Sequence, residues 1–206
     1  REEAWVKSIA EEHAIDLIIS DNRYGVHHPT IPSIFITHQL IIKAPYRWVQ
    51  SIIQWVNYFF IKKFTACWVP DMAAAPGLAG ELSHPATLPP IPVHYMKLLT
   101  RFHRVTCATK YNFAVVLSGP EPQRTMLERK ILKDLDTYTK PVLLVRGLPA
   151  ESEGIEVPSH VTVFNHLDTI ELANELQQAD YIISRGGYTS LMELISIDKK
   201  LIVVPT

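Results

Sequence analysis

The chain has 206 residues, which is enough to bury one large hydrophobic core or two modest ones. Its 20 Lys and Arg residues nearly balance its 21 Asp and Glu residues, so it offers no strongly basic surface, and we expect no nucleic acid as a partner. The two cysteines, Cys67 and Cys107, lie far apart without the spacing of metal ligands, which indicates a cytoplasmic protein with reduced thiols and no structural zinc.

The first part of the chain has the pattern of a parallel α/β domain. A helix is expected at residues 2–13, and four short apolar runs are predicted as strands, at 15–20, 33–37, 64–71 and 92–96. Asp21 follows the first strand and His38 the second. Because α/β proteins bind ligands at the carboxyl ends of their strands, both are candidates for catalytic residues. The alternatives are a solvated turn at Asp21 and a His38 ring bonded to a neighbouring carbonyl.

Residues 46–63 form an amphipathic helical pattern with basic residues at both ends. The apolar residues of one face include Trp48, Ile52, Trp55 and Phe59. The run is too polar to span a bilayer. We favour a helix that buries this face, because core helices are more common than helices that lie on membranes. The alternative is peripheral contact with an anionic membrane surface.

A domain boundary is expected near the middle of the chain. Residues 97–110 are basic and polar with little apolar pattern, so we assign a first domain to 1–96, a linker to 97–110 and a second domain to 111–206. In the second domain strands are expected near 113–118, 141–146, 161–165, 181–184 and 201–204, and helices at 123–135, 168–178 and 188–197. This alternation predicts a parallel sheet with helices on both faces.

Two strand-to-helix turns of the second domain contain glycine and predict anion binding. Gly119 lies in one turn, and Gly186 and Gly187 form the other. A helix start carries unpaired N–H groups and partial positive charge, glycine lets a ligand approach, and both turns should meet at one sheet edge. Arg124 would add a full positive charge. Neither turn has the glycine pattern of a P-loop or of a dinucleotide-binding motif, so neither an ATPase nor a dehydrogenase is indicated.

Glu193 lies four residues after Thr189, on the same helix face and one turn further along. Its carboxylate could accept hydrogen bonds from a diol. An equally good interpretation is a capping box, Ser190-Leu191-Met192-Glu193, in which the carboxylate only binds backbone N–H groups at the helix start.

With these motifs the sequence resembles the GT-B glycosyltransferases of family 28, whose best-known member is the peptidoglycan N-acetylglucosaminyltransferase with its lipid-linked acceptor. The resemblance implies two Rossmann-like domains, of which the second holds a UDP-sugar. It also implies a nucleotide site, with phosphate contacts in two turns, a ribose contact at the glutamate and a uracil contact after the third strand. By number, these residues are Gly119, Arg124, His166, Leu167, Arg185, Gly186, Gly187, Thr189, Ser190 and Glu193.

The chain also departs from the family pattern. Pro120 and Pro122 replace small, flexible residues, and two family loops would lie upstream of Arg1 and just after Thr206, so both domains are expected to be incomplete. We therefore expect a UDP-binding glycosyltransferase fragment that is inactive by itself. The donor would be UDP-N-acetylglucosamine or a relative, the acceptor is unknown or lipid-linked, and the enzyme would need no metal or other cofactor. It would work in the cytoplasm, peripheral on the inner face of the membrane. The alternatives are a UDP-sugar hydrolase or epimerase, or a non-catalytic nucleotide-binding module.

Overall fold

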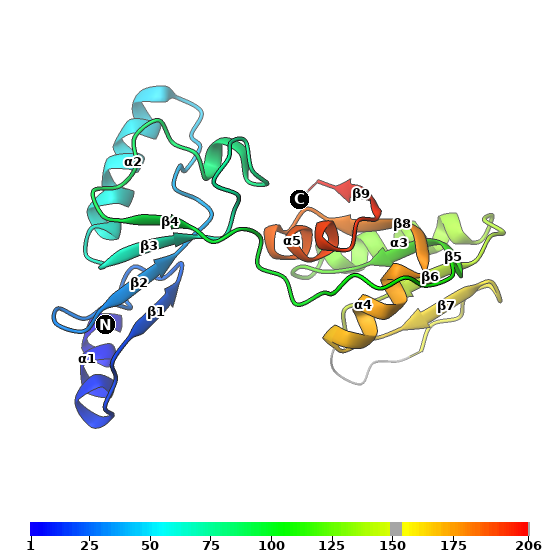
Figure 1. Cartoon of the computed structure of the whole chain (residues 1–206). Coiled ribbons are helices and arrows are strands. Elements are labelled where there is room, and N and C mark those ends of the chain that lie inside the picture. Colours follow the sequence, from blue (N-terminus) through cyan, green and yellow to red (C-terminus); the bar gives the residue numbers. More distant parts are fainter. Residues whose placement is uncertain (149–153, 206) are drawn as a thin grey trace. The chain divides into compact units, whose positions relative to one another are not determined.

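The structure, a computed structural model, describes residues 1–148 and 154–205 (Figure 1). The chain divides into two compact units, residues 1–99 and 100–206. Residues 149–153 and residue 206, where the predicted second domain ends, lie outside the described part. Residues 100–110, predicted as part of a linker, group with the second unit, where Phe102 is buried in the core.

The first unit contains a four-stranded parallel sheet of the order β1-β2-β3-β4. The strands are β1 (Ile18–Asp21), β2 (Ser33–Ile36), β3 (Ala66–Val69) and β4 (Val93–Tyr95), and the helices are α1 (Glu2–Glu12), α2 (Arg47–Ile61) and the short 3₁₀ helix η1 (Gly80–Leu82). Phe35, Cys67 and Val69 of the strands are fully buried against Ile61 of α2. The predicted parallel sheet is therefore confirmed in this unit.

The prediction that α2 buries its aromatic face is wrong. Trp48 and Trp55 are 67% and 69% exposed, whereas Asn57 is buried. The physical reason is that the polar side of the helix binds the Leu40 carbonyl, so that this side faces inward.

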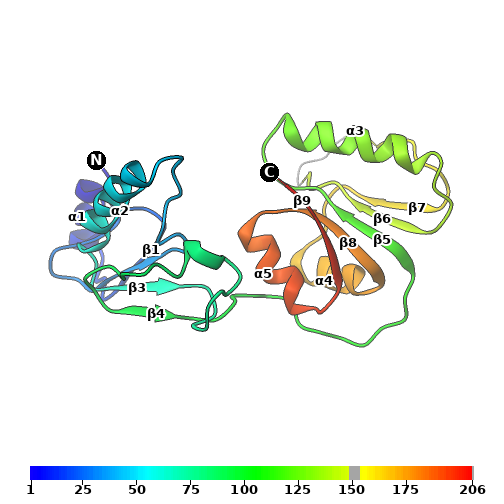
Figure 2. The same cartoon turned by 90° about the horizontal axis from the view of Figure 1, so that it is seen from above.

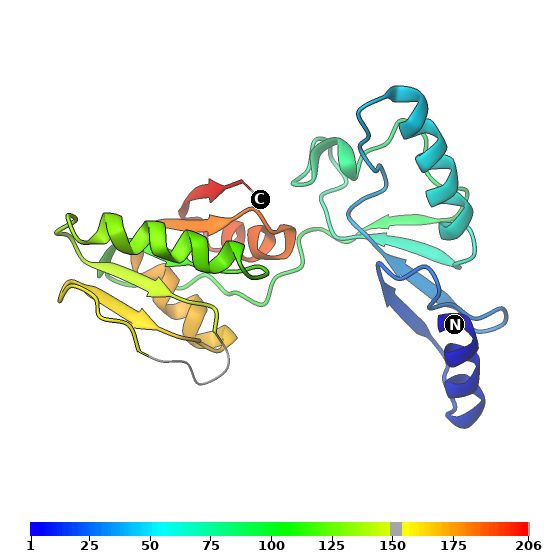
Figure 3. The same cartoon turned by 180° about the vertical axis from the view of Figure 1, so that it is seen from behind.

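The second unit has a five-stranded parallel sheet of the order β7-β6-β5-β8-β9. The strands are β5 (Tyr111–Val116), β6 (Val142–Val145), β7 (Val161–Phe164), β8 (Ala179–Arg185) and β9 (Lys200–Val204), and the helices are α3 (Gln123–Leu135), α4 (Thr169–Gln177) and α5 (Tyr188–Ser196). Figure 2 and Figure 3 show α3 on one face of this sheet, and Figure 2 shows α4 and α5 on the other. Two separate cores fill these faces, as the alternation of strands and helices predicts.

The order of the second sheet reverses at β5, because the chain continues from β5 to β6 on one side and reaches β8 on the other. In open α/β sheets a crevice forms at the carboxyl ends of the two strands that flank such a reversal, and ligands bind there. The turns that follow β5 and β8 are the two glycine turns that the sequence singled out. The fold therefore brings both turns to the same edge of the sheet.

Candidate functional site

Arg185, the last residue of β8, reaches across to the turn that follows β5. Its Nη1 donates a hydrogen bond to the Ser118 carbonyl at 3.2 Å. Gly119 has a φ of +99°, which side chains rarely adopt, and a Cβ there would collide with the Arg185 guanidinium. The sequence thus needs glycine at this position both for the backbone and for the arginine. The positively charged Arg185 guanidinium therefore lies beside the Gly119 backbone, which no side chain covers. Both lie at the edge of the sheet where the strand order reverses.

The start of α5 completes this edge. The N-cap residue of the helix is Gly187, so no N-cap side chain accepts from the first turn. Gly186 N–H donates to the Val204 carbonyl at 3.2 Å, which fixes the turn to the end of β9. Gly187 and Thr189 are exposed and Ser190 is half-buried. A helix start of this kind, next to an arginine, suits a phosphate group.

The start of α3 is less suited to an anion. The Thr125 N–H donates to the Glu121 carboxylate at 3.2 Å, so this helix start already holds a negative group. Hydrogen bonds from Thr125 and Arg124 lower the pKa of Glu121, which keeps it ionised. A phosphate could bind at this helix start only by displacing the Glu121 carboxylate. The starts of α3 and α5 could therefore bind one anion together, as expected, only after that displacement.

Arg124 lies in a buried network of charges at the end of β6. Its Nε contacts the Glu121 carboxylate at 2.6 Å, and its Nη1 contacts the Glu128 carboxylate at 3.3 Å. Arg146 Nε contacts the same Glu128 at 2.5 Å, and the Arg146 carbonyl accepts from Arg124 Nη1. In this structure Arg124 holds α3 against the end of β6, and direct contact with a ligand would require several of these bonds to break.

Glu193 does not form the capping box that its sequence permits. The helix begins at Tyr188 with Gly187 as N-cap, so Ser190 is already inside the first turn and the capping interpretation is wrong. The Glu193 carboxylate instead accepts from Nε and Nη2 of Arg101, at 2.8 and 2.7 Å. Both nitrogens bind Oε1, and among the described residues Oε2 has no hydrogen-bond partner. That oxygen is available to a ligand hydroxyl.

The predicted uracil contact, His166-Leu167, follows β7. His166 is exposed, whereas the Leu167 side chain is buried in the core, so only the backbone of Leu167 can meet a ligand. Asp168 then caps α4 by accepting from the N–H groups of Ile170 and Glu171. With strands spaced about 4.8 Å apart, β7 lies roughly 10 Å from β5, a distance that a nucleoside can cover.

In the first unit, Asp21 ends β1 and is exposed, and His38 follows β2 and is half-buried. Burial lowers the pKa of the His38 imidazole, although the carboxylates of Asp21 and Asp71 oppose this shift. His38 is therefore neutral near pH 7 and able to accept a proton. Sequence reasoning missed the role of Asp71, whose only signal was its place two residues after the end of β3.

Asp71 is buried and organises the loop that follows it. Its carboxylate accepts from the N–H groups of Met72, Leu78 and Ala79 and from the Ser83 hydroxyl, at 2.6 to 3.0 Å. Burial alone would raise the pKa of Asp71, but these hydrogen bonds outweigh it and lower the pKa. The carboxylate is thus a structural anion at the same sheet edge as His38.

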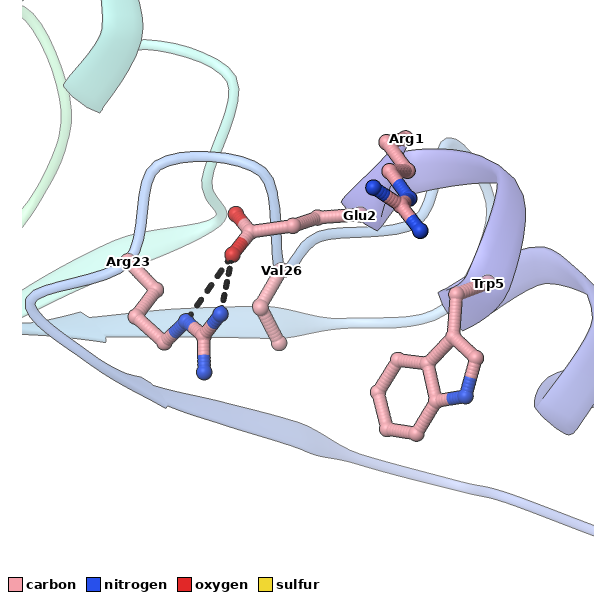
Figure 4. A pocket seen from close by; sticks show the side chains of 5 residues that line it. All are labelled: Arg1, Glu2, Trp5, Arg23 and Val26. Carbon is pink, nitrogen blue, oxygen red and sulfur yellow. Dashed lines mark hydrogen bonds and ion pairs between the residues drawn. The ribbon is translucent and has the colours of Figure 1, made fainter.

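A hollow of about 470 Å³ also opens beside α1. It is lined by Arg1, Glu2, Trp5, Arg23 and Val26 (Figure 4). The Arg23 guanidinium is paired with the Glu2 carboxylate, as the dashed lines in Figure 4 show. Of the three charged side chains that line the hollow, these two satisfy each other, and only that of Arg1 is left to orient a ligand. Among the described residues no group of three or more His, Cys, Asp or Glu side chains could hold a metal ion.

Comparison with known proteins finds similarity to glycosyltransferases. Residues 129–206 match the glycosyltransferase family 28 C-terminal domain. The fold is similar to the spinosyn forosaminyltransferase SpnP (14% identity, TM-score 0.58), to the glycosyltransferase SnogD from Streptomyces nogalater (14%, 0.61) and to the glycotransferase of kitacinnamycin (15%, 0.58). These matches cover 98%, 100% and 99% of this chain but 60%, 63% and 61% of those chains.

The chain thus spans about three fifths of the length of these glycosyltransferases. No curated protein matches its sequence. At such identities the similarity establishes the fold, an α/β architecture with two parallel sheets flanked by helices, of the GT-B type.

Proposed function

We propose that the chain is part of a glycosyltransferase whose second unit binds a UDP-sugar, UDP-N-acetylglucosamine or a relative, and whose acceptor is carried by a lipid. The observation that carries the donor site is the pairing of Arg185 with Gly119 at the reversal of strand order, beside the start of α5. The match of residues 129–206 to the C-terminal domain of a glycosyltransferase family supports it. The proposal includes a cytoplasmic location, peripheral on the membrane.

In the proposed reaction the acceptor hydroxyl forms a bond to the anomeric carbon while the bond from that carbon to the diphosphate oxygen breaks. Negative charge grows on the leaving diphosphate, and the start of α5 and the Arg185 guanidinium would stabilise it there. The free Oε2 of Glu193 would accept from a ribose hydroxyl.

A base must also remove the proton of the attacking hydroxyl. His38 is the better candidate of the two in the first unit, because burial keeps it neutral and able to accept that proton. Asp21, which is exposed and acts on His38 by its charge, is the other. A hydrolase would use the same donor site with water as acceptor.

Calorimetric titration with UDP, GDP and ADP tests the donor site. We expect UDP to bind most tightly, and Arg185→Ala to weaken UDP binding about tenfold, because a charge-assisted hydrogen bond to phosphate is lost. Arg129→Ala, which removes an exposed arginine of α3, is the matched control and should bind UDP like the parent. Equal binding of the three nucleotides, or no binding, would contradict the proposal. Release of free sugar without an acceptor would instead favour hydrolysis.

A further inference from the structure

The outer side of α2 is an exposed aromatic surface. Four of its residues, at spacings of four, three and four, form what we call the aromatic face of α2: Trp48, Ile52, Trp55 and Phe59. Their exposed fractions are 67%, 54%, 69% and 43%. Large apolar side chains gathered at this density on one helix face usually mark a surface that meets another apolar phase.

The helix cannot rotate to bury this face, because its inner side is fixed by hydrogen bonds. Gln54 Nε2 and Asn57 Nδ2 both donate to the Leu40 carbonyl, at 2.8 and 3.2 Å. Asn57 also accepts from the Tyr24 hydroxyl at 2.8 Å. The following turn ends on Ile61, which is fully buried. Rotation would leave these buried polar groups without partners, so the exposure of the aromatic face is built into the unit.

The segment that carries the aromatic face has only basic charges of its own. Residues 22–70 contain no Asp or Glu, although the whole chain has a net charge of -1. The cations of this stretch are Arg23, Lys43, Arg47, Lys62 and Lys63. Three of them pair with acids from outside the stretch, at Glu2, Glu81 and Glu3.

Two cations of this stretch flank the aromatic face and are in no ion pair among the described residues. Arg47 begins α2, and Lys62 directly follows it, with its Nζ 4.5 Å from the centre of the Phe59 ring. An apolar face with interfacial aromatic residues and unpaired cations at both ends complements a layer of lipid tails beneath anionic headgroups.

We propose that the aromatic face of α2 lies in the interface of an anionic lipid bilayer, with Arg47 and Lys62 against headgroup phosphates. Its 15 residues make a helix of about 22 Å, which would lie along the surface. No helix among the described residues is long and apolar enough to cross a membrane. The inference rests on the proposed function in one respect, since a membrane surface is where a lipid-linked acceptor is found.

Sedimentation with vesicles tests this docking surface. The full chain is mixed with vesicles of phosphatidylcholine alone or with phosphatidylglycerol added, at low and high salt. We expect binding to the anionic vesicles that falls with salt. Replacing Trp48 and Trp55 by Ser should lower the apparent affinity at least tenfold, and Arg47→Glu with Lys62→Glu should abolish the preference for anionic lipid.

Trp5→Ser is the matched control, because Trp5 of α1 is also exposed, at 61%, but lies outside the aromatic face. It should bind vesicles like the parent. Absent binding at low salt, or an equal loss in Trp5→Ser, would overturn the inference. A third result would also overturn the inference: the parent chain forms a dimer and does not bind vesicles, and the double Trp variant is a monomer. A second copy of the chain would then cover the aromatic face. The same variants are also titrated with UDP. If they bind UDP but the parent does not bind vesicles, the docking surface is wrong and the donor site is not.

Discussion

Gly119 and Arg185 depend on each other, which makes a glycine-to-alanine change informative. Gly119→Ala should cost about 1 kcal/mol of folding free energy for its positive φ, and it should also displace the Arg185 side chain. We therefore expect UDP binding to weaken at least fivefold by calorimetry. Gly80→Ala is the control, because Gly80 also has a positive φ but open space around its Cα. An equal loss of UDP affinity in both variants would show that strain alone is responsible.

Arg101 holds one oxygen of Glu193 and leaves the other open, so it is a positioning residue for the ribose contact. Arg101→Ala should weaken UDP binding severalfold, because the carboxylate loses its orientation and its charge then opposes the diphosphate. Binding of 2′,3′-dideoxy-UDP, which lacks both hydroxyls, should respond much less to Glu193→Ala than binding of UDP does. Arg104→Ala is the control, since Arg104 is equally exposed and pairs with Asp198. Identical effects of the two arginine variants would refute this role.

Asp71 stabilises the first unit through its ionised form. Its pKa in the folded state is below the ordinary value of 3.8, so its contribution is complete above that pH and is lost as the pH falls through the folded-state pKa. Asp71→Asn should lower the unfolding free energy by about 2 kcal/mol at pH 7. The difference from the parent should shrink as the pH falls below 3.8 and through the folded-state pKa. Urea unfolding followed by Trp fluorescence measures this, with the exposed Asp16→Asn as control.

Among the elements, α3 depends on a buried charge network for its place on the sheet. Glu128 of α3 accepts from two arginines, Arg124 of the same helix and Arg146 at the end of β6. Glu128→Ala removes the carboxylate that these two buried arginines share and should lower the unfolding free energy of the second unit by about 3 kcal/mol. Glu121→Ala removes an exposed partner of Arg124 and an acceptor of the Thr125 N–H group, and it should lower the urea midpoint of circular dichroism less than Glu128→Ala does. Equal midpoints for both variants would mean that the network does not hold α3.

The elements that sequence predicted well are those whose signal is local. The run at 181–184, the Gly186-Gly187 turn and the helix beginning at Tyr188 became β8, a glycine N-cap and α5 because strand propensity, glycine and helical spacing act over a few residues. The gathering of both glycine turns at one edge followed from the parallel order of the sheet.

The errors came from contacts between residues far apart in sequence. The aromatic face of α2 is exposed because Gln54 and Asn57 bind a carbonyl at Leu40, which no helical pattern encodes. Glu193 forms no capping box, and its partner Arg101 lies 92 residues away. The phosphate contact of Arg124 stays a prediction, and the buried partner of this arginine, Arg146, follows β6 and lies 22 residues away.

The whole molecule consists of two units with separate sheets and separate cores. In the proposed enzyme these would have different tasks, since the donor residues all lie in the second unit and the candidate bases and the aromatic face of α2 lie in the first. A ligand stabilises only the cooperative body that binds it. Whether the donor binds to the second unit alone can therefore be measured without knowing the acceptor.

UDP should stabilise the second unit alone. All four tryptophans, at 5, 48, 55 and 68, lie in the first unit, so Trp fluorescence follows the unfolding of that unit only. At a hundred times its dissociation constant UDP adds about 2.7 kcal/mol to the stability of the body that binds it. We expect a shift to higher urea in the transition seen by far-ultraviolet circular dichroism, without a shift in the fluorescence transition. If UDP shifts the fluorescence transition to the same extent, the two units unfold as one body. In either case, Arg185→Ala should abolish the shift that UDP causes.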